Sequence, residues 1–354
     1  MDLPRFRAAA VQAAPVFLDT RATVAKACDL VRAAADGGAR LVALPEVFVP
    51  AYPYWNWTMS PIRGSAWFER LVEASIEIPG PEIDQLRDTA RSTGCTVVIG
   101  VNERDPYSMG TLYNSLVFIG GDGVLLGVHR KLVPTWAEKL TWAGGDGRSV
   151  RVYDTPIGRL GGLACGENTN TLARFALLAQ GENVHVASYI ALPVAPPDYD
   201  MVEAIRLRSA AHAFEGKIFS IVSCAAITPE IVDAVAHDSE SRAFLERKHS
   251  AFSGIFGPDG RLLTEPLIDD EGIVYADIDL RRCIQPKQMH DIIGHYNRFD
   301  VFQLHLDRRP RGGLVCHDEA AAAPATDPRS DTVDALLGRA GPASHASSRP
   351  ARSS

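Results

Sequence analysis

The feature that most constrains this chain is the alternation of short, continuously apolar segments with longer amphipathic ones. The apolar segments predicted to be buried strands are residues 6–15, 40–46, 95–101, 183–189 and 218–224. The segments predicted to be helices are residues 20–39, with Thr20 or Thr23 as the N-cap, 85–93, about 169–180 and about 199–215. Continuously apolar strands occur in sheets whose faces are covered by helices. The pattern therefore predicts a layered α/β fold.

Two Asp-Gly turns indicate that the sheets are mixed and not purely parallel. Residues 111–119 and 124–132 flank the sequence Gly-Gly-Asp-Gly, and residues 251–257 and 261–267 flank Pro-Asp-Gly. Asp-Gly between two strand-like runs is a strong hairpin signal. Residues 272–280 are predicted to form a further strand. These strands suffice for two sheets that face each other, with helices outside.

Composition limits the number of domains. The chain has 354 residues, of which 46% are hydrophobic, so it can bury one large core or two smaller ones. No linker interrupts residues 1–310, and we predict one domain over residues 1–315. Residues 316–354 are rich in Ala, Pro, Ser, Asp and Arg and hold few large apolar residues. This composition predicts a mostly disordered tail.

Charge and cysteine usage exclude several classes of protein. The net charge is −7 and no dense basic stripe is present, so we expect no nucleic-acid partner. No signal peptide and no apolar run of membrane-spanning length is evident, so we expect no membrane partner. The six cysteines are scattered without Cys-x-x-Cys pairs, which favours reduced thiols, a cytoplasmic location and no structural zinc.

Cys165 lies where an apolar run stops and a polar stretch begins, in GGLACGENTN at residues 161–170. Asn168, Thr169 or Asn170 is suited to cap the helix that follows. A thiol beside a helix N-terminus is expected to have a lowered pKa, which would favour a nucleophilic thiolate. The alternative is a buried structural cysteine, and the residues alone leave both interpretations open.

Glu46 ends the apolar run LVALPE, at the carboxyl edge of a predicted strand. Open sheets gather reactive groups at such edges. Burial raises the pKa of a carboxyl group toward neutrality, which suits a general base. The alternative is a surface glutamate that starts a loop. The aromatic stretch at residues 47–57 favours the first interpretation, because it would wall off a dry pocket.

Lys131 ends the run VLLGVHRKL, and strand alternation places it on the same face as His129, opposite Arg130. A lysine there would stabilise a developing anion, although lysine also commonly blocks strand edges. Glu138 lies in the aromatic and glycine-rich loop at residues 133–147. Alone it would be a solvated loop residue, whereas beside Lys131 it would hold the lysine's charge and help to position a water.

Taken together, Glu46 in LVALPE, Lys131 in HRKLVPTWAE and Cys165 in GGLACGEN resemble the Glu–Lys–Cys catalytic set of the nitrilase superfamily. The resemblance extends over residues 5–305. The stretches FVPAYPYW, GVNER, TLYNSLVF, TWAGGDG and GHYNRFD are similar to the true nitrilase branch. It implies a four-layer α-β-β-α sandwich, no metal and no organic cofactor. It also implies homodimers that assemble into spirals or filaments.

The resemblance implies hydrolysis of a nitrile to a carboxylic acid and ammonia, through a thioimidate and a thioester on Cys165. Glu46 would be the base, and Lys131 would stabilise charge on the substrate with Glu138 in support. Transfer of a proton from an ordinary thiol to an ordinary glutamate is uphill by roughly 5–6 kcal/mol, which the site must offset. The predicted substrate-binding residues are Tyr52, Trp55, Trp57, Trp136, Gly166, Glu167, Asn168 and Tyr189.

One residue departs from the pattern of the branch. Gly166 follows the cysteine where many nitrilases have tryptophan. The smaller residue would either leave room for a bulky substrate or have its space filled by a neighbour. Other functions to distinguish are an amidase or carbamoylase of the same superfamily, a cyanide-degrading enzyme, and a non-catalytic scaffold that self-assembles. An intact Glu–Lys–Cys set argues against the scaffold.

Overall fold

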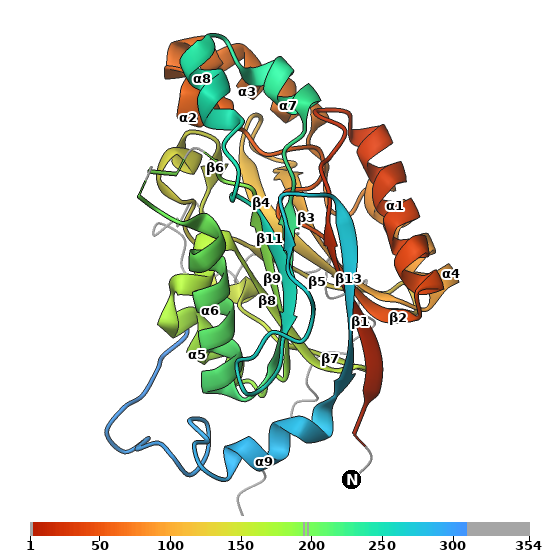
Figure 1. Ribbon diagram of the computed structural model, residues 1–354, viewed down its shortest axis with the longest axis vertical. Helices are drawn as coiled ribbons and strands as arrows, with labels where there is room; N and C mark the ends of the chain where they lie inside the picture. The colour runs from red at the N-terminus through yellow and green to blue at the C-terminus, as the bar shows by residue number, and fades with distance from the viewer. Residues whose placement is uncertain (1–2, 194, 197, 310–354) are drawn as a thin grey trace, which may run out of the picture. The chain divides into compact units, whose positions relative to one another are not determined.

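Two mixed β-sheets lie face to face between pairs of helices (Figure 1). The computed structural model describes residues 3–309, apart from residues 194 and 197. The first sheet has the order β13-β1-β2-β3-β4-β5, with β6 paired to β4. Its strands are β1 (Arg5–Gln12), β2 (Ala39–Ala43), β3 (Thr96–Arg104), β4 (Leu112–Ile119), β5 (Leu125–Arg130), β6 (Trp142–Ala143) and β13 (Gly272–Asp279).

The second sheet has the order β12-β11-β10-β9-β8-β7. Its strands are β7 (Tyr153–Thr155), β8 (Gly158–Ala164), β9 (Val184–Ile190), β10 (Phe219–Ala225), β11 (Phe252–Phe256) and β12 (Leu267–Ile268). In each sheet three strands are parallel and their outer neighbours are antiparallel. The predicted mixed sheets and the β4–β5 hairpin are thus confirmed.

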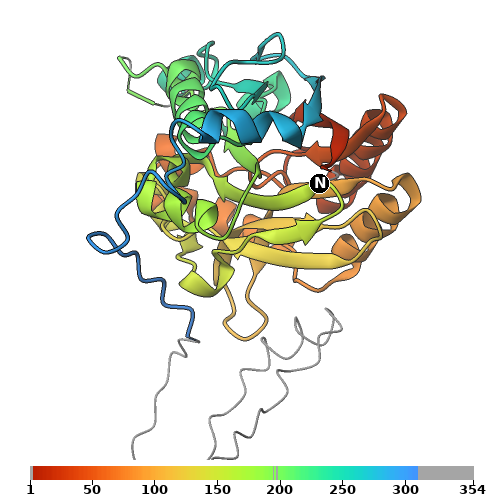
Figure 2. The same cartoon turned by 90° about the horizontal axis from the view of Figure 1, so that it is seen from below.

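Helices cover the outer face of each sheet. Helices α1 (Thr20–Asp36) and α4 (Pro81–Thr93) pack their apolar faces on the first sheet. Helices α5 (Thr171–Leu178) and α6 (Met201–Gly216) pack on the second. Figures 1 and 2 show the strands between these two helical layers. The predicted α-β-β-α sandwich is therefore confirmed.

The apolar core between the sheets brings the carboxyl ends of two strands together. Leu41, Leu116 and Phe118 of the first sheet pack in one cluster with Val186 and Phe219 of the second. Beyond this cluster, the Ser188 hydroxyl at the end of β9 donates a hydrogen bond to the Leu44 carbonyl, just after β2. Residues that follow β2 and β8 are thereby held at one edge of the sandwich, the edge where open sheets place their sites.

Several local predictions were wrong for identifiable reasons. Asp19, and not Thr20 or Thr23, caps α1, because both threonine hydroxyls donate to carbonyls of other segments. Asn170 caps α5. Residues 261–266 form no regular strand, because β11 pairs with them through one isolated bridge, Phe256 to Leu262, and its regular partner β12 begins only at Leu267.

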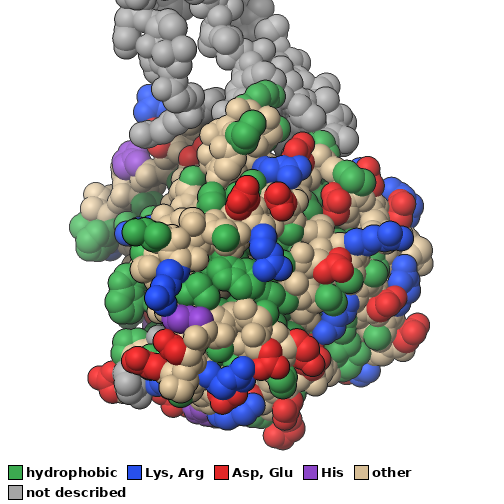
Figure 3. All heavy atoms as spheres, turned by 90° about the horizontal axis from the view of Figure 1, so that it is seen from above, with side chains coloured by type: hydrophobic (Ala, Val, Ile, Leu, Met, Phe, Trp, Pro, Cys, Tyr) green, Lys and Arg blue, Asp and Glu red, His purple; other side chains and the backbone are tan. Residues whose placement is uncertain are grey.

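Helices that the sequence analysis missed gather at one end of the sandwich. They are α2 (Trp55–Thr58), α3 (Pro61–Ala74), α7 (Pro229–Val235) and α8 (Ser239–Leu245), at the top of Figure 1. Figure 3 looks onto this end, where hydrophobic side chains lie among charged ones. A cavity of about 320 Å³ lies beside α7 and α8. A further short helix, α9 (Ile284–Lys287), follows β13.

The remaining predictions on organisation are only partly testable. The predicted tail at residues 316–354 lies outside the described residues, so the domain boundary at residue 315 stays a prediction. Among the described residues, no helix has the length and apolar character needed to cross a bilayer. The cysteines in this part of the chain are free thiols, namely Cys28, Cys95, Cys165, Cys224 and Cys283.

Candidate active site

Glu46 lies three residues beyond β2, in a loop that passes directly over β3. The Gly100 amide donates to the Pro45 carbonyl at 3.0 Å. A Cβ atom at Gly100 would lie 2.5 Å from the Glu46 Cα atom and 2.3 Å from the Val47 nitrogen. Only glycine permits this crossing. The Glu46 amide donates to the Tyr189 carbonyl at 3.3 Å, which ties the loop to the second sheet.

Lys131 follows β5 and is held by its own backbone, since its amide donates to the Asn114 carbonyl at 2.8 Å. Its Nζ atom lies 2.9 Å from Glu46 Oε1 and 2.7 Å from Glu138 Oε2. All three side chains are at most 2% exposed. The structure thus brings Glu46 together with two residues from a distant part of the sequence, as a buried ion cluster. We call Glu46, Lys131 and Glu138 the acid–lysine cluster.

Hydrogen bonds fix both carboxylates of the acid–lysine cluster. Glu138 Oε2 also accepts from the Thr135 amide at 2.7 Å, and Glu138 Oε1 accepts from the Tyr52 hydroxyl at 3.1 Å. Asn114 Nδ2 donates to Glu46 Oε1 at 2.7 Å. Glu46 Oε2 is buried and has no hydrogen-bond partner among the described residues. This oxygen is therefore the acceptor in the cluster that is free to take a proton.

The electrostatics of the cluster follow from two carboxylates that share one ammonium. Burial raises the pKa of Glu46, Lys131 opposes this shift, and Glu138 adds to it. Burial alone would lower the pKa of Lys131, but Glu138 and Glu46 outweigh it and hold that pKa well above its usual value. Lys131 thus stays protonated, while Glu46 is a stronger base than an exposed glutamate.

Cys165 directly follows β8, with its backbone in the left-handed region at φ 48°. Non-glycine residues rarely adopt this conformation outside sites that demand it. Burial raises the pKa of the thiol, Glu46 and Glu138 raise it further, and Lys131 and Arg208 only partly oppose them. The predicted lowering of this pKa was wrong, because α5 begins only at Thr171 and burial dominates. The resting side chain is a neutral thiol under the field of the acid–lysine cluster.

The turn that carries Cys165 is held by its two following polar residues. Glu167 accepts from the amides of Ala164 and Leu132 at 3.1 and 2.8 Å, and lies 2.8 Å from His129 Nε2. Asn168 Nδ2 donates to the carbonyls of Leu163 and Cys165, each at 3.1 Å. Glu167 and Asn168 therefore shape the turn, and their predicted contact with substrate stays a prediction.

One edge of the sandwich thus holds a buried base (Glu46), a fixed cation (Lys131) and a cysteine in a rare backbone conformation (Cys165). These are the groups that acyl transfer by a nucleophilic cysteine requires. A family model described as "Carbon-nitrogen hydrolase" matches residues 7–288 of this chain.

This chain belongs to the carbon–nitrogen hydrolase family.

Named relatives of this hydrolase cover most of its length. An aliphatic nitrilase of Rhodococcus rhodochrous is 40% identical over 308 residues, which is 86% of this chain and 83% of that protein. A nitrilase of Bacillus sp. strain OxB-1 is 36% identical over 324 residues, covering 90% of this chain and 93% of that protein.

Solved structures share the fold at lower identity. A carbon–nitrogen hydrolase of Helicobacter pylori G27 matches with a TM-score of 0.62 at 20% identity, over 81% of this chain and 93% of that one. An amidase of Nesterenkonia sp. matches with a TM-score of 0.56 at 18% identity, over 80% of this chain and 94% of that one.

The aromatic residues predicted to bind substrate divide into two groups in this hydrolase. The Tyr52 hydroxyl accepts from Trp57 Nε1 at 2.9 Å, and the Trp57 ring meets the Trp136 ring edge-on at 5.5 Å between centroids. Trp136 is 70% exposed. Trp55 instead stacks on Trp67 in the core of the helical end, so these contacts give its predicted role no support.

Tyr189 and Gly166 lie close to the nucleophile. Tyr189 is fully buried in the same apolar cluster as Cys165. A Cβ atom at Gly166 would lie 3.0 Å from Thr135 Oγ1, so a neighbour already borders the space that a larger residue would enter. The substrate contacts of both residues stay predictions.

Sequence analysis missed the polar partners of the predicted residues. Asn114 and His185 both interrupt apolar strands with a polar side chain that is fully or nearly fully buried. A buried polar residue must find partners, and this signal was available in TLYNSLVF and NVHVASY. Which partners they find depends on pairing between distant segments, which spacing does not reveal.

Proposed function

We propose that this hydrolase converts an organic nitrile to its carboxylic acid and ammonia, with Cys165 as the nucleophile. The observation that carries the proposal is the buried acid–lysine cluster whose charges act on the neutral Cys165 thiol. Relatives of similar length that are named nitrilases support the choice of a nitrile as substrate.

The first step is attack of sulfur on the nitrile carbon. Glu46 Oε2 takes the thiol proton as the carbon–sulfur bond forms, and that proton passes to the nitrile nitrogen. The product is a thioimidate. Because the pKa values of Cys165 and Glu46 are both raised, a free thiolate need not accumulate before attack. Lys131 and the backbone N–H that follows Cys165 stabilise the negative charge that develops on nitrogen.

Two waters complete the reaction. Glu46 activates the first water, which adds to the thioimidate carbon, and ammonia leaves to give a thioester. The second water attacks the thioester, releases the carboxylic acid and returns the proton to Cys165. The sum is one nitrile and two waters to one acid and one ammonia. Glu138 keeps Lys131 in place through the 2.7 Å ion pair, while Tyr52 and Thr135 hold Glu138.

The test compares Cys165→Ala with Cys224→Ala, which removes another buried thiol from the same apolar cluster. Ammonia and acid are measured from a panel of aliphatic, arylaliphatic and aromatic nitriles, from the matched amides and from cyanide. We expect Cys165→Ala to lose at least about 1,000-fold in activity and Cys224→Ala to stay near wild type. Hydrolysis retained by Cys165→Ala contradicts the mechanism, and turnover of amides or cyanide alone contradicts the substrate.

We further propose that the protein associates with copies of itself. Large apolar side chains lie exposed on the segment after α9, among them Phe302 at 69% and Tyr296 at 60% exposure. Such patches mark interaction surfaces. Light scattering coupled to gel filtration is expected to show a dimer or larger species, and Phe302→Ser is expected to reduce its mass. A wild-type monomer at micromolar concentration contradicts this proposal.

A further inference from the structure

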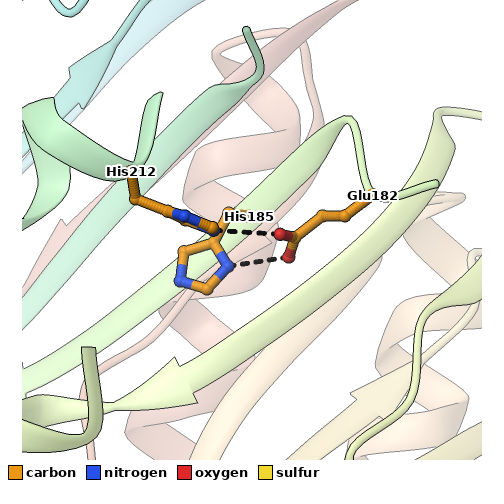
Figure 4. Close-up of side chains that lie close together, drawn as sticks. All are labelled: Glu182, His185 and His212. Atoms are coloured by element: carbon orange, nitrogen blue, oxygen red, sulfur yellow. Dashed lines mark hydrogen bonds and ion pairs between the residues drawn. The ribbon is translucent and has the colours of Figure 1, made fainter. Parts of the chain in front are cut away.

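A second buried cluster consists of Glu182, His185 and His212, whose side chains Figure 4 shows, and it is hydrogen-bonded to the turn that carries Cys165. Glu182 Oε1 lies 2.7 Å from His185 Nδ1, and Glu182 Oε2 lies 3.0 Å from His212 Nε2. His185 Nε2 lies 2.9 Å from Asn168 Oδ1, and Asn168 in turn donates to the Cys165 carbonyl. A continuous chain of hydrogen bonds thus runs from a buried carboxylate to the backbone of Cys165.

The sequence makes room for this cluster with one glycine. A Cβ atom at Gly161 of β8 would lie 2.1 Å from Glu182 Oε1. Any other residue there would displace the carboxylate from beneath the strand that leads to Cys165. Gly161 therefore leaves the space that the Glu182 carboxylate occupies. The same stretch, GGLACGEN, also contains Asn168, which is hydrogen-bonded to the Cys165 carbonyl.

The hydrogen-bond partners fix the protons on His185. Asn168 uses its amide hydrogens on the carbonyls of Leu163 and Cys165, so its Oδ1 atom is an acceptor and His185 Nε2 must donate. Burial alone would raise the pKa of Glu182, but His185 and the hydrogen bonds from both histidines lower it to about 2. Because Glu182 is ionised and can only accept, its contact with His185 Nδ1 is a hydrogen bond that His185 donates.

His212 provides the hydrogen bond to the second oxygen of Glu182 and is itself uncharged. Burial and the charge of His185 lower the pKa of His212 to about 4, so the ring is neutral and donates from Nε2. Its Nδ1 atom is buried and has no partner among the described residues. The same three side chains have metal-ligand chemistry, and their ligand atoms lie within 4.8 Å of one another. Both oxygens of Glu182 and both ring nitrogens of His185 already have protein partners, so His212 Nδ1 is the one ligand atom of these three side chains without a partner among the described residues.

We propose that Glu182, His185 and Asn168 form a positioning relay that holds the backbone of Cys165 in its left-handed conformation. Glu167 holds the backbone before Cys165 by accepting a hydrogen bond from the Ala164 amide. The relay holds the backbone after it, because Asn168 donates to the Cys165 carbonyl. His185 does not touch the substrate. It acts by fixing the orientation of the Asn168 side-chain amide, which holds the Cys165 backbone and so determines where the sulfur points. This proposal rests on the proposed role of Cys165.

Two substitutions cut the relay on opposite sides of His185. His185→Asn retains a donor at the place of Nδ1 for Glu182 and loses the donor to Asn168. His185→Gln retains a donor at the place of Nε2 for Asn168 and loses the one to Glu182. We expect His185→Asn to lower kcat by about 100-fold with KM within about threefold, the scale expected from misplacing a reacting group by about 1 Å. We expect a smaller loss for His185→Gln.

His212→Gln is the comparison variant, because it alters the same cluster at equal burial without touching Asn168. We expect it to lose less than about fivefold in kcat. For each variant, circular dichroism and thermal unfolding report folding, and the rate of Cys165 alkylation by iodoacetamide, read by peptide mass spectrometry, reports access to the sulfur. The alkylation rate is expected to fall with kcat across the variants.

The outcomes separate the relay from its rivals. If folded His185→Asn keeps kcat and the alkylation rate within about threefold of wild type, the relay is wrong. If His212→Gln loses as much as His185→Asn, the cluster serves stability and not position. Elemental analysis that finds about one metal ion per chain overturns the proton assignment. If Cys165→Ala remains active, the proposed function fails, and the alkylation rates still test the relay.

Discussion

Two buried charge clusters in this hydrolase have similar parts and opposite properties. The acid–lysine cluster holds two carboxylates and one cation, and the cluster of Glu182, His185 and His212 holds one carboxylate between two histidines. In the first, Glu46 Oε2 is left without a partner among the described residues. In the second, both oxygens of Glu182 are hydrogen-bonded.

The difference in partners decides the difference in pKa. The pKa of Glu46 is raised, and that of Glu182 is lowered to about 2. A buried carboxylate with an unpaired oxygen is a base, whereas a buried carboxylate with both oxygens paired is a fixed support. The carboxylate with an unpaired oxygen, Glu46, is thus suited to act as the base. The fully paired carboxylate, Glu182, is suited to hold the residues that position the nucleophile.

The largest expected effects come from exchanging each carboxylate for its amide. Glu46→Gln removes the base and should lower kcat by at least about 1,000-fold, with little loss of thermal stability because the lost charge was incompletely paired. Glu182→Gln removes the buried carboxylate that both histidines share and should cost about 3–5 kcal/mol of stability. Steady-state kinetics and chemical denaturation measure both. Equal stability losses in the two variants would contradict the comparison.

A middle-sized effect is expected when the second carboxylate of the acid–lysine cluster loses its charge. Glu138→Gln should lower kcat by about 10–100-fold, because Lys131 loses its 2.7 Å ion pair. Since Glu138 also raises the pKa of Glu46, the acidic limb of the kcat/KM profile should move to lower pH in the variant. A pH series on wild type and variant checks this, and an acidic limb that moves upward rules the assignment out.

The two clusters differ in how much of each could be predicted from the sequence. Glu46, Lys131 and Cys165 end apolar runs, and strand-edge reasoning together with the nitrilase-like motifs predicted their grouping. Glu182 and His212 follow no such rule, since Glu182 precedes β9, His212 lies in α6, and the two meet only through tertiary packing.

Prediction also failed where long-range contacts override local signals. The polar GENTN stretch suggested a helix terminus that would ionise the thiol, and burial by distant segments reverses the direction of that pKa shift. Helix α2 was missed because the aromatic stretch at residues 47–57 was interpreted as a pocket wall, and no helix was predicted over α3, α7 or α8. The four-layer sandwich itself was predictable, because hydrophobic periodicity records which face of each element is covered.

The smallest expected effect is a change in the pH dependence of stability, which tests whether His212 is neutral in the folded protein. Its pKa falls from an ordinary 6.5 to about 4 on folding. The unfolded chain therefore binds this proton first, so the contribution is complete above pH 6.5 and is lost as the pH falls toward 4. Relative to wild type, His212→Gln should flatten the acid dependence by up to about 1.4 kcal/mol per pH unit in that window. Parallel slopes in denaturation series at several pH values would count against a neutral, buried His212.

The central claim is that Cys165 rests as a neutral thiol and is activated only by Glu46 during attack. The most direct test is the difference in far-ultraviolet thiolate absorbance between wild type and Cys165→Ala, followed from acidic to alkaline pH in the absence of substrate. The account predicts no thiolate signal at neutral pH and a rise only above the ordinary thiol pKa of 9.0. A full thiolate signal at or below neutral pH would contradict it.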